Sequence, residues 1–548
     1  MDTLARLGDE YFRLHFAAEP FLAGVFGVAG YEAEVPDPSR AADALRQTGL
    51  ARLAAELATV DRDALDGSDR ISHGVLTRLL HDEQRILHDG VAEVAVTASI
   101  AGPLAQMVST VPAATGSDEA YLARLDKLGS FFDRHVERYR QAAHDGRFPT
   151  ELGVRQAIGQ VDAYLATPVG RDPLVKRLPA DGRAADLVAS VVRPALTRFR
   201  TALAEQLLPV GRSGEKVGLS HVPGGTDGYR ALVRAYTTTD LDPEEIHQIG
   251  LDLVGGLRQE FADRGSRALG TSDVDEVLVR LRDDPALRFS TTAEIVDTVT
   301  DALRRAEAAV PDWFAGYDIA PCVVREMDTS EAENSVLGYY VAPAADGSRP
   351  GAHVVNTYRP DLRPRFEYEV LAFHESVPGH HLQIAVAQSR PDLPQFRRFA
   401  FFDAHGEGWG LYTERLSDEM GLYTSELSRL GMVSFDAWRA CRLVVDTGMH
   451  HLGWSRERAI AYMRTNTALS ETNIANEIDR YIAMPGQALA YMIGRLRIQQ
   501  LRDRARAAHG PAFDIRAFHH QVLAHGPLPL DTLEELIAPT RGNGKSGS

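Results

Sequence analysis

The chain has 548 residues, 44% hydrophobic and 25% charged, which are the proportions of a soluble globular protein with an ample core. Its formal net charge of −17 argues against nucleic acid and an anionic membrane surface as partners. The two cysteines, Cys322 and Cys441, exclude a disulfide framework and fit a reducing compartment. The N-terminus lacks the pattern of a signal peptide, and no apolar run reaches the roughly 18 residues of a membrane span. We therefore expect a cytoplasmic protein.

The predicted elements are mostly helices. Helical patterns fill residues 1–317, which we expect to be a scaffold without a fixed-length repeat. Asp242, Pro243 and Glu245 predict one helix start with a capping box, and Thr291 with Glu294 predicts another.

Residues 318–360 differ, because PCVVREM, LGYYVAP and AHVVNTYRP are short and β-rich. They predict a small antiparallel sheet. Helices resume over 361–539, the expected catalytic part, and the polar stretch 540–548 is expected to be a disordered tail. The fold class is therefore mainly α, with residues 1–539 forming one large unit.

The stretch HESVPGHH at 374–381 contains the first half of a zinc-protease motif, H-E-x-x-H, in which two histidines one turn apart bind one metal. Pro378 stands where the second histidine belongs, and it should break the helix that ends near His374 and Glu375. In a straight helix His381 would share the face of His374. If Ser376 and Val377 are instead an insertion in the motif, His380 takes the place of its second histidine. Spacing alone leaves both histidines open.

A glutamate is the expected third ligand in a site of this type. Glu407 lies in FFDAHGEGWGLYTERL between Gly406, Gly408 and Gly410. Three glycines in a helix cost roughly 1 kcal/mol each relative to alanine. This pattern suggests that another backbone approaches closely beside Glu407.

At these residues the sequence resembles the family called domain of unknown function 885. The resemblance rests on four stretches, which are HESVPGHHLQ at 374–383, GEGWGLYTE at 406–414, VDTGMHHLGWS at 445–455 and RYIAMPGQALAYMIG at 480–494. The family's motif, usually written HExxPGH, favours His380 over His381 as the second ligand. Its fold is similar to that of the gluzincin-type, thermostable HExxH carboxypeptidases, which have a deep groove between helices and a small sheet beside the zinc.

The resemblance implies a zinc-dependent enzyme, and the resulting hypothesis is a carboxypeptidase-like metallopeptidase that acts on small peptides. His374, His380 and Glu407 would hold one zinc ion per chain and leave a fourth position for water. Glu375 would be the general base that activates the zinc-bound water. Manganese or cobalt could occupy the same ligands.

The remaining site residues are predicted in three roles. Tyr491, Tyr481 and His450 are candidate donors to the oxyanion, because related helical zinc peptidases use Tyr or His from this part of the chain. Arg480 or Arg495 would clamp a substrate carboxylate. His381 and His405 are expected to orient the ligands, and Asn356 would belong to a sheet edge that pairs with the peptide.

Two other functions fit the same residues. One is a zinc amidohydrolase that acts on a non-peptide or modified-peptide amide, and it would differ from a carboxypeptidase by cleaving substrates whose carboxyl end is blocked. The other is an inactive scaffold of the same fold, against which the retained Glu375 argues. The sequence leaves the oligomeric state undetermined.

Overall fold

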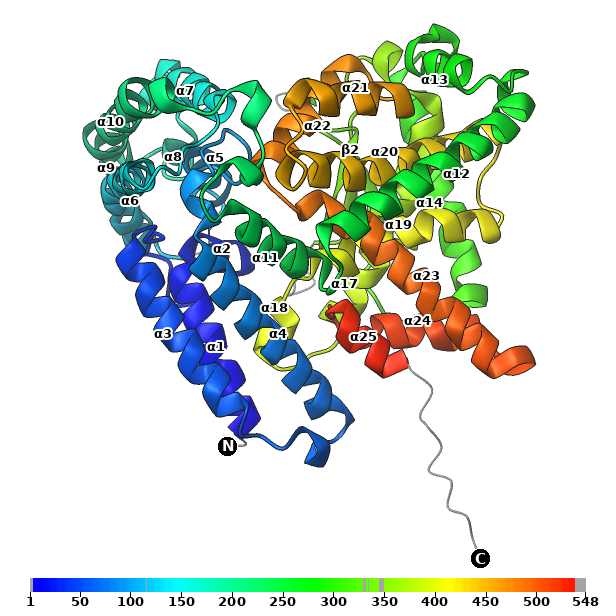
Figure 1. Ribbon diagram of the computed structural model, residues 1–548, viewed down its shortest axis with the longest axis horizontal. Helices are drawn as coiled ribbons and strands as arrows, with labels where there is room; N and C mark the ends of the chain where they lie inside the picture. The colour runs from blue at the N-terminus through cyan, green and yellow to red at the C-terminus, as the bar shows by residue number, and fades with distance from the viewer. Residues whose placement is uncertain (1–2, 115, 329–331, 334, 344–348, 538–548) are drawn as a thin grey trace, which may run out of the picture. The chain divides into compact units, whose positions relative to one another are not determined.

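The computed structural model of the chain describes residues 3–114, 116–328, 332–333, 335–343 and 349–537 (Figure 1). The predicted tail at 540–548 lies outside these ranges. Within them, no helix combines the length and the apolar composition that crossing a membrane requires. The sequence predicts one large unit, whereas the contacts gather into two compact units.

Unit 1 consists of Met1–Leu232, Val445–Ala461 and Ala475–Gly486. One hydrophobic core of this unit lies between α6, α7 and α10, where buried side chains such as Phe131, Phe132 and Phe199 pack together. The helices of this unit are α1 (Thr3–Ala18), α2 (Pro20–Phe26), α3 (Arg40–Leu57), α4 (Gly67–Asp89), α5 (Pro103–Thr110), α6 (Asp118–His144), α7 (Glu151–Ala166), α8 (Pro173–Lys176), α9 (Gly182–Leu187) and α10 (Arg193–Ala202).

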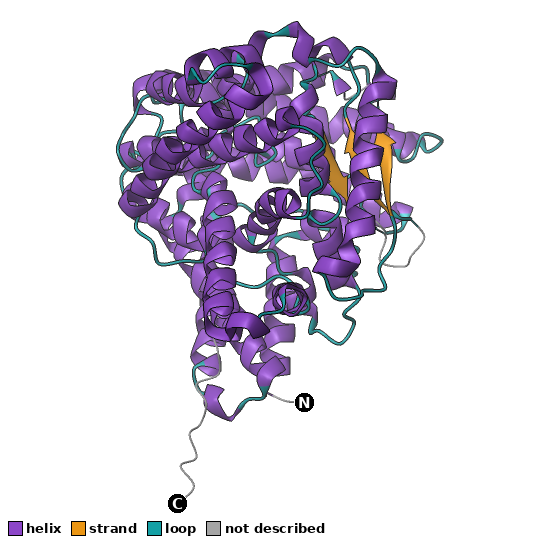
Figure 2. Ribbon diagram, turned by 90° about the vertical axis from the view of Figure 1, so that its right-hand side faces the viewer, coloured by secondary structure: helices purple, strands orange, loops and turns teal. Residues whose placement is uncertain are grey.

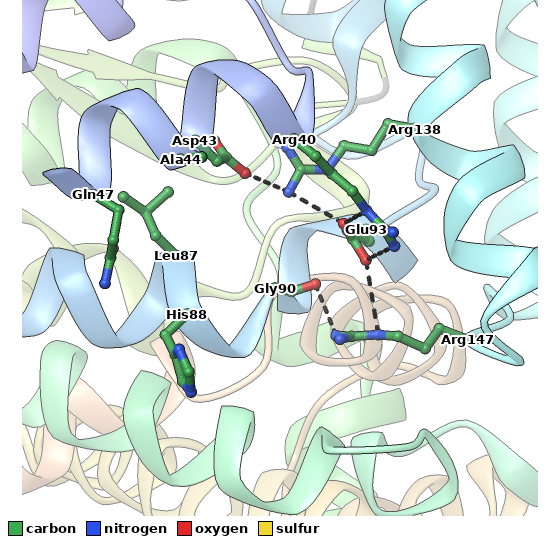
Figure 3. A pocket seen from close by; sticks show the side chains of 10 residues that line it. All are labelled: Arg40, Asp43, Ala44, Gln47, Leu87, His88, Gly90, Glu93, Arg138 and Arg147. Carbon is green, nitrogen blue, oxygen red and sulfur yellow. Dashed lines mark hydrogen bonds and ion pairs between the residues drawn. The ribbon is translucent and has the colours of Figure 1, made fainter.

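A polar pocket of about 350 Å³ lies in unit 1 around Glu93 (Figure 3). Arg40 donates two hydrogen bonds to the buried Glu93 carboxylate, at 2.7 and 2.9 Å. Arg138 and Arg147 approach the same carboxylate at 3.7 and 3.9 Å. Acidic partners balance the arginines, since Arg40 also pairs with Asp145 at 2.7 Å. The cluster therefore ties the surrounding helices together.

Unit 2 consists of Val233–Val444, Tyr462–Ile474 and Gln487–Ser548. Its helices are α12 (Pro243–Leu269), α13 (Val274–Asp283), α14 (Thr292–Trp313), α16 (Tyr368–Glu375), α17 (His380–Gln388), α18 (Gln395–Phe399), α19 (Asp403–Glu419), α23 (Ala490–His509), α24 (Ile515–Leu523) and α25 (Leu530–Ile537). Four further helices belong to both units: α11 (Gly225–Thr237), α20 (Glu426–His450), α21 (Arg456–Asn466) and α22 (Glu471–Ala483).

Both predicted helix starts are present in unit 2. Asp242 and Glu245 form a complete capping box at the start of α12. At α14 the side chain of Thr291 accepts a hydrogen bond from the N–H of Glu294. The Glu294 carboxylate accepts from the N–H of Ser290 instead of Thr291, so this second box is half formed.

The sheet of unit 2 has three strands, β1 (Cys322–Glu326), β2 (Gly338–Val341) and β3 (Gly351–Val355), and Figure 2 shows them against the helices. The strand order is β1-β3-β2. The sheet is mixed and not wholly antiparallel, because β3 pairs parallel with β1 and antiparallel with β2. β3 is therefore the central strand, with every residue buried.

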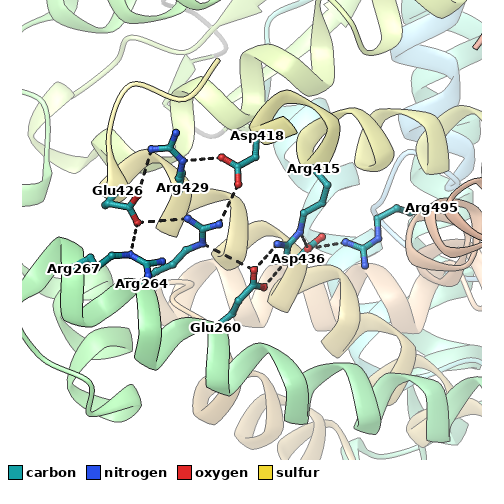
Figure 4. A network of polar contacts seen from close by, with 9 residues as sticks. All are labelled: Glu260, Arg264, Arg267, Arg415, Asp418, Glu426, Arg429, Asp436 and Arg495. Carbon is teal, nitrogen blue, oxygen red and sulfur yellow. Dashed lines mark hydrogen bonds and ion pairs between the residues drawn. The ribbon is translucent and has the colours of Figure 1, made fainter. Parts of the chain in front are cut away.

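A network of charges connects four helices of unit 2 (Figure 4). The buried Asp436 of α20 pairs with Arg415 of α19 and, at 2.7 Å, with Arg495 of α23. Arg415 also makes two contacts of 2.7 Å with Glu260 of α12. Arg495, predicted as a clamp for a substrate carboxylate, is thus bound to a carboxylate of the protein itself.

Candidate metal centre

The motif HESVPGHH lies where α16 ends and α17 begins. Gly379 is required in this link, because a Cβ there would lie 1.9 Å from the carbonyl oxygen of His374. The indole Nε1 of Trp409 donates a hydrogen bond of 3.0 Å to the carbonyl oxygen of Pro378 and holds the link in place. As a result, the rings of His374 and His380 lie almost perpendicular to each other, with their centroids 4.7 Å apart.

Glu407 of α19 completes a group of three possible metal ligands. Its Oε2 lies 3.6 Å from Nε2 of His374 and 3.4 Å from Nε2 of His380. Charge-assisted hydrogen bonds are shorter, at roughly 2.7–2.9 Å. Ligand atoms about 2.1 Å from a tetrahedral zinc ion lie about 3.4 Å apart, so the observed separations match a shared cation better than direct pairing. Two histidines and a glutamate are also a donor set of catalytic zinc sites.

Residues on one face of α19 hold the His374 ring in position. Glu407, Gly410 and Glu414 share this face, because they are three and then four residues apart. The His374 ring lies directly on Gly410, where a Cβ would come within 2.7 Å of its Cε1 atom. The fully buried Glu414 carboxylate lies 2.8 Å from Nδ1 of His374. A carboxylate on the second ring nitrogen is the usual way in which proteins orient a metal-binding histidine.

The other two glycines of the α19 motif allow close packing. A Cβ on Gly408 would lie 2.5 Å from the backbone of Gly494 on α23. A Cβ on Gly406 would lie 3.3 Å from the ring of Phe401. The close backbone approach expected beside Glu407 is therefore present, and its partner is α23.

Burial and neighbouring charges shift the pKa values at this centre. Burial lowers the pKa of His374, but its carboxylate neighbours Glu407 and Glu414 outweigh burial and raise it to about 9. Burial raises the pKa of Glu407, and the two histidines reverse this and hold it well below its usual value. Burial also raises the pKa of Glu375, which makes this carboxylate a better proton acceptor.

Comparison with known proteins places the chain in a family. The family model described as "Bacterial protein of unknown function (DUF885)" matches residues 20–537. The chain belongs to the DUF885 family. No curated protein matches this DUF885 chain.

Two solved structures resemble this DUF885 protein over nearly the whole length of both chains. The "putative lipoprotein" from Colwellia psychrerythraea is 25% identical, with a TM-score of 0.89 and coverage of 98% of this chain and 99% of that one. The "putative lipoprotein of unknown function" from Shewanella oneidensis is 18% identical, with a TM-score of 0.79 and coverage of 98% and 100%. The second similarity shows the shared fold alone.

Spacing left His380 and His381 open as the second candidate ligand, and the structure brings His380 close to the other two candidates, His374 and Glu407. The adjacent His381 is turned towards the sheet, where its Nδ1 lies 3.0 Å from the Tyr340 hydroxyl. Its Nε2 lies 2.9 Å from the carbonyl oxygen of Ala320. His381 thus anchors α17 to the sheet and does not orient a ligand.

His405 and Asn356 also have contacts that differ from their predicted roles. His405 accepts a hydrogen bond from the amide of Gln383 at 3.1 Å and lies 3.2 Å from the carbonyl oxygen of Val522. Asn356 is fully buried after the central strand, and its amide donates to the carbonyl oxygen of Ala332 at 2.7 Å. β3 has strands on both sides, so the predicted peptide-pairing edge at Asn356 is wrong.

Three predicted residues of the C-terminal motifs belong to unit 1. The hydroxyl of Tyr481 donates to Glu477 at 2.5 Å, and Arg480 pairs with the same carboxylate at 3.0 Å. His450 accepts from the N–H of Leu219 at 3.2 Å, and its other nitrogen lies 3.0 Å from the carbonyl oxygen of Tyr481. Both nitrogens of His450 are therefore used in holding chain segments together, which leaves no hydrogen for an oxyanion.

Tyr491 is the second residue of α23 in unit 2, and its ring stacks on the Arg442 guanidinium at 4.4 Å. Its role as an oxyanion donor stays a prediction.

Sequence reasoning missed three polar residues near the candidate ligands. Glu414 could have been found, because it lies seven residues after Glu407 on the same helix face. Asp403, one turn before Glu407, could have been found in the same way. His353 gave no signal: it is fully buried on β3, and among the described residues neither of its ring nitrogens has a hydrogen-bond partner. Burial and the nearby His374 lower its pKa to about 3, so His353 is neutral.

Proposed function

We propose that this DUF885 protein is a zinc-dependent hydrolase that cleaves peptide bonds in small peptides. The observation that carries the proposal is the spacing of His374, His380 and Glu407 around one point. The carboxylate of Glu414 on the far nitrogen of His374 supports it, since this arrangement orients a metal ligand.

The chemistry divides between the cation and the protein. A zinc ion held by His374, His380 and Glu407 would polarise the scissile carbonyl and lower the pKa of a water molecule. Glu375, next in sequence to the first ligand, would take the proton of the attacking water and deliver it to the leaving amine. Tyr491 is kept as the proposed donor to the developing oxyanion.

The base is suited to this task by its surroundings. Glu375 is half-buried at the end of α16, and it has no hydrogen-bond partner among the described residues. When no hydrogen-bond donor of the protein occupies the lone pairs of a carboxylate, they stay available to accept a proton, and partial burial increases the basicity of the carboxylate. In a purely structural metal site, a fourth protein ligand would be expected in place of water.

Hydrolysis by wild type and Glu375→Gln tests the proposal. Both proteins should bind one zinc ion per chain, and only the wild type should cleave a library of short peptides, as followed by mass spectrometry. A wild type that binds zinc and cleaves no peptide would indicate the amidohydrolase or the inactive scaffold. Loss of zinc from Glu375→Gln would show that Glu375 is a ligand and not the base.

The cytoplasm is the compartment that we propose. Cys322 and Cys441 are both buried and free, which agrees with a reducing environment. The two similar structures are described as those of a "putative lipoprotein", and this description would instead fit an envelope protein. Cell fractionation followed by detection of the untagged chain separates the two locations.

A further inference from the structure

Helix α19 carries a second carboxylate close to the candidate metal centre, that of Asp403. This residue opens α19 one turn before Glu407, and it is half-buried. Its Oδ1 accepts a hydrogen bond of 3.1 Å from the amide of Gln487, which fixes the orientation of the carboxylate. Apart from a bond with its own backbone N–H, the carboxylate makes no further hydrogen bond within the described residues. Since Phe402 occupies the N-cap position and makes no side-chain cap, Asp403 is not explained as the cap of α19.

The charges around the centre leave an excess of negative charge. Glu407, Glu414, Glu375 and Asp403 are four carboxylates. Among the described residues, the arginine that forms an ion pair with one of them is Arg439, 3.8 Å from Glu414. A divalent cation and one guanidinium would therefore leave one negative charge unbalanced. Burial and the proximity of Glu407 raise the pKa of Asp403 to about 6, so it is still ionised at neutral pH. A substrate that brings a positive charge would restore the balance.

The arginines predicted to bind a substrate carboxylate are engaged elsewhere. Arg495 pairs with Asp436 at 2.7 Å, and Arg480 pairs with Glu477 at 3.0 Å. The Asp403 carboxylate thus keeps acceptor capacity for a substrate, whereas both predicted guanidiniums already have carboxylate partners. Recognition of an amino end is the chemistry that fits these contacts.

We propose that Asp403 binds the free α-amino group of a peptide substrate, so that the enzyme acts at the amino end. This inference rests on the proposed peptidase function. The ring of Phe401 is 58% exposed and lies against Gly406. Gly406 stands between Asp403 and Glu407 in the sequence. The Phe401 ring offers an apolar surface to the first side chain of such a peptide. Asp403 is accordingly a specificity residue that contacts the substrate's ammonium group.

The test uses one short peptide with a free amino end, its N-acetylated form and its C-terminally amidated form. Wild type should cleave the free and amidated peptides alike and the acetylated one at least about 10-fold less efficiently. Asp403→Asn should raise KM for the free peptide roughly 10- to 100-fold with little change in kcat, because a hydrogen bond to a charged group is lost. Its low rate on the acetylated peptide should equal that of wild type.

Asp503→Asn is the matched control, since Asp503 on α23 accepts a glutamine amide at the same 3.1 Å and is exposed. It should behave as wild type, and zinc content and unfolding temperature should be equal in all three proteins. Equal cleavage of the free and acetylated peptides, or an unchanged KM in Asp403→Asn, would overturn the inference alone. Loss of cleavage on amidation would assign the enzyme to the carboxyl end. A wild type that neither binds zinc nor cleaves overturns the proposed function and this inference with it.

Discussion

Replacing Gly410 with alanine should weaken metal binding while leaving the helix itself intact. Alanine in a helix interior is normally favoured over glycine by about 1 kcal/mol. At this position, however, the new Cβ would lie 2.7 Å from Cε1 of His374, which is 0.7 Å closer than the 3.4 Å at which ordinary contacts begin. The imidazole must move by a distance of that order. Metal–ligand distances tolerate only about 0.2 Å.

A displacement of this size should lower zinc affinity by roughly 10- to 100-fold, the range seen when the support of a metal ligand is disturbed. The assay is a competition titration of zinc against a coloured chelator. Gly255→Ala is the control, because Gly255 lies inside α12 with nothing within 4 Å of an added Cβ. It should bind zinc as wild type does and unfold at a slightly higher denaturant concentration. If Gly410→Ala keeps the wild-type zinc affinity, the proposed position of His374 is wrong.

Three further changes give separable results. Glu414→Gln should lower zinc affinity by roughly 10- to 100-fold with the protein still folded, measured in the same titration, because the carboxylate on His374 is lost. Asp446 accepts hydrogen bonds from Tyr229 and the N–H of Gly486, and burial raises its pKa from 3.8 to about 7. The folded chain therefore binds this proton more tightly, and the free energy of unfolding should fall as pH rises from about 4 to 7. Urea titrations of Asp446→Asn should lack that part of the slope; an identical slope would contradict the assignment. His353→Leu should increase the free energy of unfolding by about 1 kcal/mol, since it removes two buried nitrogens that have no hydrogen-bond partner among the described residues. A decrease in the free energy of unfolding would contradict this assignment.

Local patterns predicted the features that depend on neighbours in sequence. The capping box at Asp242, the helix break at Pro378 and the β-rich region at 318–360 all follow from residues within a few positions of one another. The family resemblance then favoured His380 over His381, a choice that spacing had left open.

Features that depend on distant segments could not be predicted in this way. The order of the strands places β3 in the centre, and nothing within AHVVNTYR distinguishes a central strand from an edge. Arg495 pairs with Asp436, 59 residues away in the sequence. The sequence does not distinguish such a paired arginine from one that is exposed to solvent. The partners of His450 and His405 are mostly backbone carbonyl and N–H groups, which no side-chain pattern reveals.

The most direct test of the central claim is the zinc content of His380→Gln and His381→Gln beside wild type, measured by plasma mass spectrometry after equilibration with zinc. The two variants make the same change at adjacent residues, of which only His380 lies with His374 and Glu407. We expect one zinc ion per chain in wild type and in His381→Gln, and little in His380→Gln. Equal zinc in both variants, or none in wild type, would contradict this expectation.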